Sequence, residues 1–229
     1  MVVAIIAGKG GVGKTSQVFS IAKLFEPWRW AIMEKKDERA IGEGGDLLIG
    51  IDDKYMVNPI NTLNNFENWR DIVLSEERKC IVVDGISDIR DYAIEEWIQT
   101  HPIYDSKGNE KKRESIGAKN LTGWSEVNKR TRALLEPLVN YGLYKGVHVF
   151  FTAQMKQLYK DNIRVGEQPD IKEWMEYPVE CLIILKKTED TYTCTCDKAP
   201  MWSQGAFSSE LRKDTGLLEV MSIQGLLEE

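Results

Sequence analysis

The sequence predicts an α/β protein with a mostly parallel central sheet, helices on both faces of that sheet and an antiparallel hairpin at one edge. Short apolar runs of strand length alternate with helical patterns, and two late strand-like segments follow each other across a tight turn. The 229 residues are 42% hydrophobic, which is enough for one sizeable core, and no repeat or long linker divides them. We therefore expect a single domain over residues 1–229.

The expected elements follow from hydrophobic periodicity and from the residues that interrupt it. Val2–Ala7 is apolar and β-branched, which predicts a buried strand. The helix that begins at Lys14 ends by Phe25, because Glu26-Pro27 stops it. The same patterns predict further strands at Trp30–Met33, Cys80–Val83 and Val147–Thr152, and helices at Leu63–Arg78, Asp88–Thr100 and Trp124–Tyr141, the last with a kink at Pro137.

The remaining segments are less regular. Glu180–Lys187 and Thr191–Asp197 alternate around a short polar turn, which predicts the antiparallel hairpin. Asp46–Val57 predicts a hairpin or an irregular excursion. Two polar stretches are predicted to be loops. Pro102–Gly123 is punctuated by glycines and predicts a mobile surface loop, and Met155–Asp170, which carries lysines, predicts a second loop. The last stretch, Ser208–Glu229, carries no decisive pattern and stays without an assignment.

Composition excludes several classes of protein. No apolar run approaches the roughly 20 residues of a membrane-spanning helix, so we expect a soluble cytoplasmic protein, in the host cytoplasm if its source is viral. The net charge of −6 does not indicate a polyanion partner for the whole surface. Four cysteines fit neither a disulfide framework nor paired metal knuckles, and strand alternation explains Cys194 and Cys196 more simply than a metal site with His101 or His148.

The strongest motif lies between the first strand and the first helix. It fits GxxxxGK[ST] in full, in the strand–loop–helix context that a phosphate-binding loop requires. Glycines let backbone N–H groups turn toward phosphate, Lys14 reaches the β- and γ-phosphate oxygens, and Thr15 coordinates Mg²⁺. The residues expected to bind ATP are Gly8, Lys9, Gly10, Gly11, Val12, Gly13, Lys14, Thr15 and Ser16.

Two carboxylates at predicted strand ends complete the expected nucleotide site. Asp84 ends a buried apolar run and is expected to support Mg²⁺. Glu34 follows the second strand and is our candidate for orienting the attacking water. The alternative for Glu34 is that it is one charge of a solvated run over residues 34–39.

Two family resemblances compete for this chain. The extra lysine of GKGGVGKT, Lys9, resembles the ParA/MinD partitioning ATPases, in which that lysine reaches across a dimer. The strand ending in Asp84 looks instead like that of RecA-like P-loop ATPases, and in that resemblance Glu34 activates water and Gln154 senses the γ-phosphate. The same resemblance implies that Lys198 reaches the nucleotide of a neighbouring subunit.

The succession of motifs over roughly residues 1–200 looks most like the compact RecA-like single-strand annealing ATPases of phages and archaeal viruses. Lys9 is unusual for that group. The resemblance implies a Mg²⁺-dependent ATPase that binds single-stranded DNA and promotes annealing or recombination as a head-to-tail ring or filament. A partitioning-type nucleotide switch and a viral DNA-packaging motor remain the alternatives.

Positive charge is concentrated in one part of the chain. Residues 105–132 carry eight cations against four carboxylates, whereas the rest of the chain is acidic. By resemblance, this loop and the stretch after Gln154 correspond to the two DNA-binding loops, with Tyr159 stacking on a base. The residues expected to contact nucleic acid are Lys107, Lys111, Lys112, Arg113, Lys119, Lys156, Tyr159, Lys160 and Arg164. The alternative is an ordinary solvated lysine-rich loop.

Overall fold

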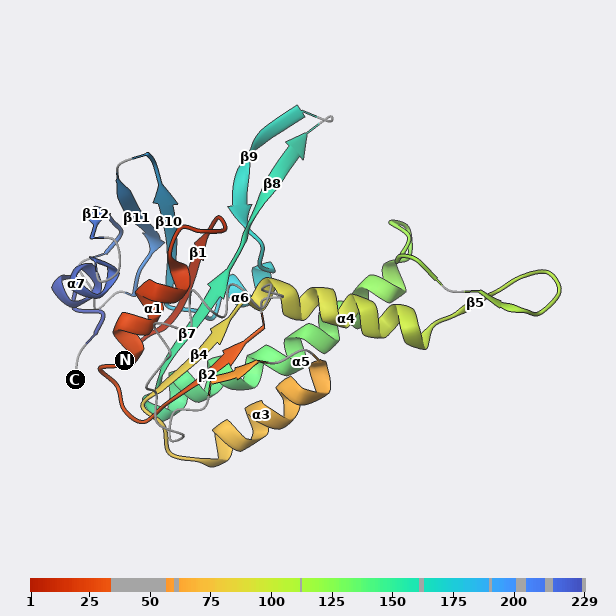
Figure 1. The fold of residues 1–229 in the computed structure, drawn as a ribbon, viewed down its shortest axis with the longest axis horizontal. Helices are drawn as coiled ribbons and strands as arrows, with labels where there is room; N and C mark the ends of the chain where they lie inside the picture. The colour runs from red at the N-terminus through yellow and green to blue at the C-terminus, as the bar shows by residue number, and fades with distance from the viewer. Residues whose placement is uncertain are drawn as a thin grey trace.

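A computed structural model describes residues 1–33, 57–59, 62–111, 113–160, 163–189, 191–200, 205–212 and 216–227. Within these ranges a mostly parallel sheet of eight strands has the order β12-β11-β10-β1-β7-β4-β2-β3 (Figure 1). Six strands from β10 to β3 are parallel, β11 is antiparallel to β10, and β12 is antiparallel to β11. The strands are β1 (Val3–Gly8), β2 (Trp28–Ile32), β3 (Val57–Pro59), β4 (Cys80–Asp84), β7 (His148–Ala153), β10 (Cys181–Lys187), β11 (Tyr192–Lys198) and β12 (Phe207–Leu211).

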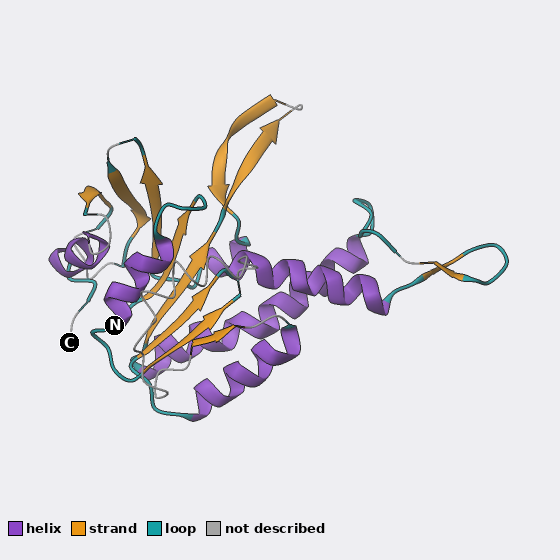
Figure 2. Cartoon of the chain, in the orientation of Figure 1, coloured by secondary structure: helices purple, strands orange, loops and turns teal. Residues whose placement is uncertain are grey.

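Helices cover both faces of this sheet (Figure 2). The helices α1 (Lys14–Ala22) and α7 (Gly216–Ile223) pack on one face, and α3 (Leu63–Ser75), α4 (Ile86–Thr100) and α5 (Leu121–Lys145) pack on the other. Successive side chains of a strand point to opposite faces, so Ile5 packs with α3–α5 whereas Ile6 packs with α1 and α7. Because both faces are buried, the central strands are apolar throughout, as the sequence predicted.

The long helix α5 approaches the sheet closely at Gly142. A Cβ there would lie 2.7 Å from side-chain atoms of both Val3 and Val149, so only glycine permits this packing distance. The helix contains Pro137 and continues past it to Lys145, four residues beyond the predicted end. It ends at Gly146, whose φ of 74° is a left-handed conformation that favours glycine.

Two hairpins extend from the body of the molecule in different directions (Figure 1). The first is a short ribbon of β5 (Ile103–Tyr104) and β6 (Glu110–Lys111) beyond the end of α4. The second pairs β8 (Met155–Lys160) with β9 (Ile163–Pro169) and starts at the carboxyl edge of the sheet. Both segments were predicted as loops, and that prediction is wrong for the paired residues. Since most of their side chains are exposed or half-buried, no apolar alternation reveals the strands.

Element boundaries otherwise differ from the predictions by a few residues. The helix α1 ends three residues early at Ala22, and α3 ends at Ser75 because Glu76 is extended. The C-terminal stretch that had no assignment forms β12 and α7. Most of the excursion predicted at Asp46–Val57 lies outside the described residues. None of the helices in the described ranges is both long enough and apolar enough to cross a membrane.

Candidate nucleotide site

The phosphate loop connects β1 to α1 at the carboxyl edge of the sheet, as predicted. Gly11 and Gly13 have φ angles of 74° and 87°, which side chains other than glycine rarely adopt. A Cβ built at Gly10 or Gly11 would meet no atom within 4 Å, so the space beside these two residues is open. The first N–H groups of α1 lie directly after this loop, where they favour bound anionic oxygen.

Lys14 is buried within the loop. Its ammonium donates to the carbonyl oxygens of Gly8 and Lys9 over 3.0 and 3.1 Å, and its Nζ lies 3.4 Å from Oε1 of Gln154. Gln154 follows β7, which is the direct neighbour of β1 in the sheet. Two residues 140 positions apart therefore meet where a γ-phosphate would lie in a P-loop site.

Asp84 is fully buried at the end of β4 and accepts hydrogen bonds from two hydroxyl groups. Thr15 Oγ1 lies 2.9 Å from Asp84 Oδ2, and Thr152 donates to Oδ1. The N–H of Gly85 donates to Thr152 Oγ1 over 2.8 Å and fixes that side chain. A hydroxyl beside a buried carboxylate is a suitable oxygen donor pair for Mg²⁺, which keeps most of its ligands as water and phosphate.

No group of three or more His, Cys, Asp or Glu side chains in the described ranges is arranged to hold a metal by itself. The open glycine loop, Lys14 and the pair of Thr15 with Asp84 fit a Mg²⁺–nucleotide complex, in which the phosphates supply the missing ligands.

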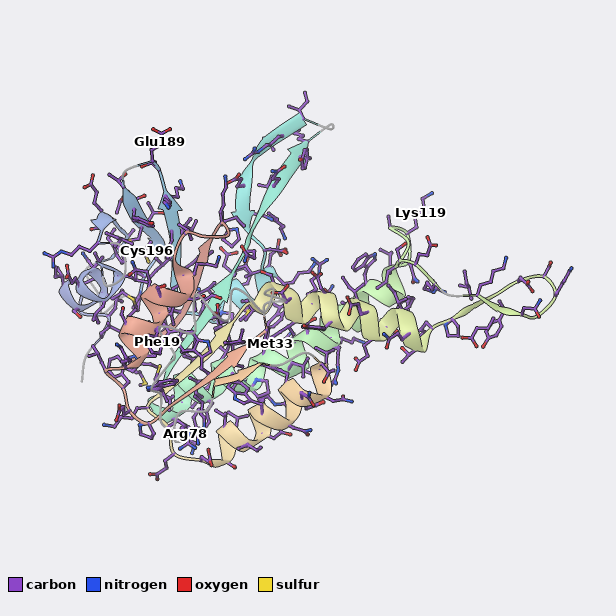
Figure 3. All side chains as sticks on the ribbon, in the orientation of Figure 1. Phe19, Met33, Arg78, Lys119, Glu189 and Cys196 are labelled. Atoms are coloured by element: carbon purple, nitrogen blue, oxygen red, sulfur yellow. The ribbon has the colours of Figure 1, made fainter. Side chains whose placement is uncertain are left out.

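Glu34, the expected water-orienting carboxylate, lies outside the described residues. The residue before it, Met33, is described and is labelled in Figure 3. The N–H of Met33 donates to the carbonyl oxygen of Asp84 over 2.7 Å. The end of β2 is thereby held beside the end of β4.

Lys9 makes a contact that the sequence did not predict. Its ammonium lies 2.8 Å from Oε1 of Glu167 on β9, and Arg164 also pairs with that carboxylate. The hydrogen bond from Lys9 holds the pKa of Glu167 below its usual range. The phosphate loop, the base of the β8–β9 hairpin and the end of β10 enclose a pocket of about 360 Å³. In this structure Lys9 therefore joins the loop to the hairpin of its own chain.

We expect Glu167→Gln to increase nucleotide affinity by roughly two- to fivefold, the free-energy range of an ion pair near the surface. Removing the carboxylate frees Lys9 to contact phosphate without first breaking its bond to Glu167. Titration with a fluorescent ATP analogue measures this, with the exposed Glu210→Gln as a matched control. If the nucleotide affinity of Glu167→Gln is unchanged or lower, Glu167 does not compete with phosphate for Lys9.

Lys198 does not join this cluster within one chain. It pairs with Leu182 near the amino end of β10, whereas Leu185 of the same strand pairs with Gly8 at the phosphate loop. The Lys198 ammonium donates to the carbonyl oxygens of Glu176 and Tyr177 over 2.6 and 2.7 Å. Contact with a nucleotide by this lysine would have to involve another subunit, as the resemblance implied.

The residues expected to contact nucleic acid fall in two separate regions, one from the β5–β6 ribbon to the start of α5 and the other on the β8–β9 hairpin. Lys107 and Lys111 are exposed on the β5–β6 ribbon, Lys119 is exposed before α5 (Figure 3), and Lys112 lies outside the described residues. Arg113 is instead held against α4, because its Nε donates to His101 O over 2.8 Å and its guanidinium lies over the ring of Trp97.

On the β8–β9 hairpin, Tyr159 and Lys160 are exposed. Lys156 pairs with Asp170 over 2.9 Å, and Arg164 pairs with Glu167. This hairpin starts one residue after Gln154, so it is attached directly to the nucleotide site. The structure thus places the second predicted DNA-binding segment beside the phosphate loop and the first one away from it (Figure 1).

Two residues of the site were missed by sequence reasoning. Thr152 bonds Asp84, and Ser87 Oγ accepts from the N–H of Gln154 over 3.0 Å. Parallel pairing of the two strands places Thr152 opposite Asp84, so a hydroxyl residue near the end of a buried strand was the available signal. The sequence gives little reason to assign Ser87 to the site, because its only notable feature is its position three residues after Asp84, at the start of a helix.

Comparisons with known proteins agree with this geometry. A family model described as "AAA domain" matches residues 2–194. Among solved structures, a KaiC-like protein, PH0186, from the hyperthermophilic archaeon Pyrococcus horikoshii OT3 is similar with a TM-score of 0.54 and 16% identity, covering 92% of this chain and 85% of that one. The RadB recombinase is similar with a TM-score of 0.50 and 10% identity, covering 92% and 86%. No curated protein matches. At these identities the structural likeness establishes the RecA-like fold.

Proposed function

The chain belongs to the AAA domain family of P-loop ATPases, and on this premise we propose that it is a Mg²⁺-dependent ATPase that binds single-stranded DNA and promotes annealing or recombination. One observation carries the proposal. Gln154 contacts Lys14 of the phosphate loop and directly precedes a hairpin with exposed aromatic and cationic side chains. A change at the γ-phosphate can therefore reach a surface suited to a single strand. The name of the RadB recombinase is consistent with a substrate of this class.

The side chains of the site divide the work of phosphoryl transfer. Lys14 places its charge on the β- and γ-phosphate oxygens, and Gln154 detects whether the γ-phosphate is present. Mg²⁺ supplies further neutralisation of phosphate charge when it is bound, held through Thr15 and Asp84. Glu34 follows the end of β2 and orients the attacking water.

The site is completed by a neighbouring subunit in a head-to-tail ring or filament. Lys198 lies toward the amino end of β10, away from the phosphate loop of its own chain, and that position supports a role at the nucleotide of another copy. Hydrolysis then depends on assembly, because a cation supplied in trans can raise the rate by about 10³-fold or more.

We expect single-stranded DNA to stimulate steady-state ATP hydrolysis at low salt, and Lys198→Ala to lower the stimulated rate by at least about a hundredfold. Duplex DNA and the absence of DNA serve as comparisons. Lys145→Ala, which removes an exposed lysine at the end of α5, controls for loss of charge.

Two outcomes would favour another function. If single strands have no effect and Lys198→Ala hydrolyses normally, a nucleotide switch in which Lys9 clamps a dimer is the better interpretation. Stimulation by duplex DNA alone would favour a packaging motor.

A further inference from the structure

Three cations converge on one carboxylate at the base of the β8–β9 hairpin. Lys156 Nζ lies 2.9 Å and Arg90 Nη1 lies 4.0 Å from Oδ1 of Asp170. Burial lowers the pKa of Lys172, and the positive charges of Arg90 and Lys156 lower it further, so all three cations are close in space. The other carboxylate that acts on Lys172 is that of Glu173. We call Arg90, Lys156, Lys172 and Asp170 the Asp170 cluster, and its cations outnumber the carboxylates around it.

Arg90 has hydrogen-bonding capacity that the described residues do not use. Its distance of 4.0 Å to Asp170 is too long for a hydrogen bond, and its buried Nε has no partner in the described part of the chain. The guanidinium is instead held over the ring of Trp124, with 5.5 Å between Cζ and the ring centroid. A guanidinium offers a planar fork that suits two oxygens of one phosphate, so a further oxyanion would satisfy it better than Asp170 does.

Aromatic rings lie beside these cations. Trp174 lines the small recess shared with Arg90, Asp170 and Lys172, and Arg132 lies over its ring at 6.0 Å. Both Trp124 and Trp174 are partly exposed. Phosphate-binding cations next to partly exposed aromatic rings are a combination that suits single-stranded nucleic acid, because each base presents a face for stacking.

The cluster is connected to the nucleotide site through the backbone. The N–H of Asp170 donates to the carbonyl oxygen of Gln154 over 2.7 Å. Ser87 bridges the same two residues, accepting from the N–H of Gln154 and donating to the carbonyl oxygen of Asp170 over 3.2 Å. A displacement of Asp170 would therefore also displace Gln154, whose side chain contacts Lys14.

We propose that Arg90, Lys156 and Lys172 form a phosphodiester-binding site for single-stranded DNA, in which a strand phosphate replaces the Asp170 carboxylate. This proposal rests on the proposed function and adds the site through which DNA acts on Gln154. Lys156 belongs to the second predicted DNA-binding segment, whereas Arg90 and Lys172 lie outside both predicted segments.

Anisotropy of a labelled oligo(dT) titrated with the full chain tests the proposal. Arg90→Ala and Lys172→Ala are each expected to weaken binding about tenfold at low salt and to lower the slope of log affinity against log salt by about one. Asp170→Asn is expected to strengthen binding, because it removes the competing charge and keeps the side-chain shape. The matched control is Lys145→Ala, which removes a distant exposed lysine.

The outcomes separate this site from the proposed function. If the wild-type chain binds oligo(dT) and both cluster variants bind like Lys145→Ala, the cluster proposal fails and the function stands. If the wild-type chain binds no oligo(dT) at low salt, both fail. Weaker binding in Asp170→Asn would also overturn the proposal.

Discussion

Lys14→Ala will reduce ATP hydrolysis by at least about a hundredfold, the usual effect of removing one donor that stabilises charge in a transition state. The ammonium is buried in the phosphate loop and already lies among the carbonyl oxygens of Gly8 and Lys9 and the Gln154 amide. Bound phosphate would be expected to attract it more strongly than these neutral oxygens do. Steady-state phosphate release measures the effect.

The control for Lys14→Ala has to separate catalysis from folding. Truncation leaves two loop carbonyl groups without their donor, and this can lower the melting temperature. Lys14→Met removes the charge and the N–H donors but keeps most of the side-chain length and volume, so it leaves a smaller gap in the loop than Lys14→Ala does. Both variants are expected to lose activity while circular dichroism remains native. Hydrolysis by Lys14→Met at the wild-type rate would exclude Lys14 from phosphate binding.

The sheet and the phosphate site were predictable because their signals are local. Strands buried on both faces are apolar throughout, and Lys14, Thr15 and Asp84 each stand at a strand or helix end that the pattern identifies. The parallel order then places these ends on one edge. Gln154 was identified by resemblance; its side chain contacts Lys14, and its role as a γ-phosphate sensor stays a prediction.

The hairpins and the Asp170 cluster were not predictable in the same way. An exposed hairpin such as β8–β9 has no buried face, so its sequence shows no consistent apolar alternation. Arg90 and Lys156 are 80 and 14 positions from Asp170, and the fold brings their charges to this carboxylate beside Lys172. The pairing of Lys9 with Glu167 is equally nonlocal, since the two residues are 158 positions apart. Long-range charge clusters of this kind leave no spacing pattern in a single sequence.

Asp84→Asn should separate metal binding from stability more clearly than any other substitution in the site. The carboxylate is fully buried and accepts from Thr15 and Thr152, whose hydroxyl groups can reverse direction and accept from an amide. The amide keeps the volume and both hydrogen bonds but loses the charge that attracts Mg²⁺. We expect Mg²⁺-dependent hydrolysis to fall at least about a hundredfold.

The melting temperature of Asp84→Asn without ligand should equal or exceed that of the wild type, because burying a charge is unfavourable and an amide removes that penalty. Wild-type protein should gain stability when Mg²⁺ and a slowly hydrolysed ATP analogue are added, by about 2.7 kcal/mol at a ligand concentration one hundred times the Kd. Asp84→Asn should lose most of this gain, whereas Asp91→Asn, at an exposed position on α4, should keep it. A large fall in the ligand-free melting temperature would instead make Asp84 a structural acceptor for the two threonines. An undiminished Mg²⁺ response would remove it from the metal site.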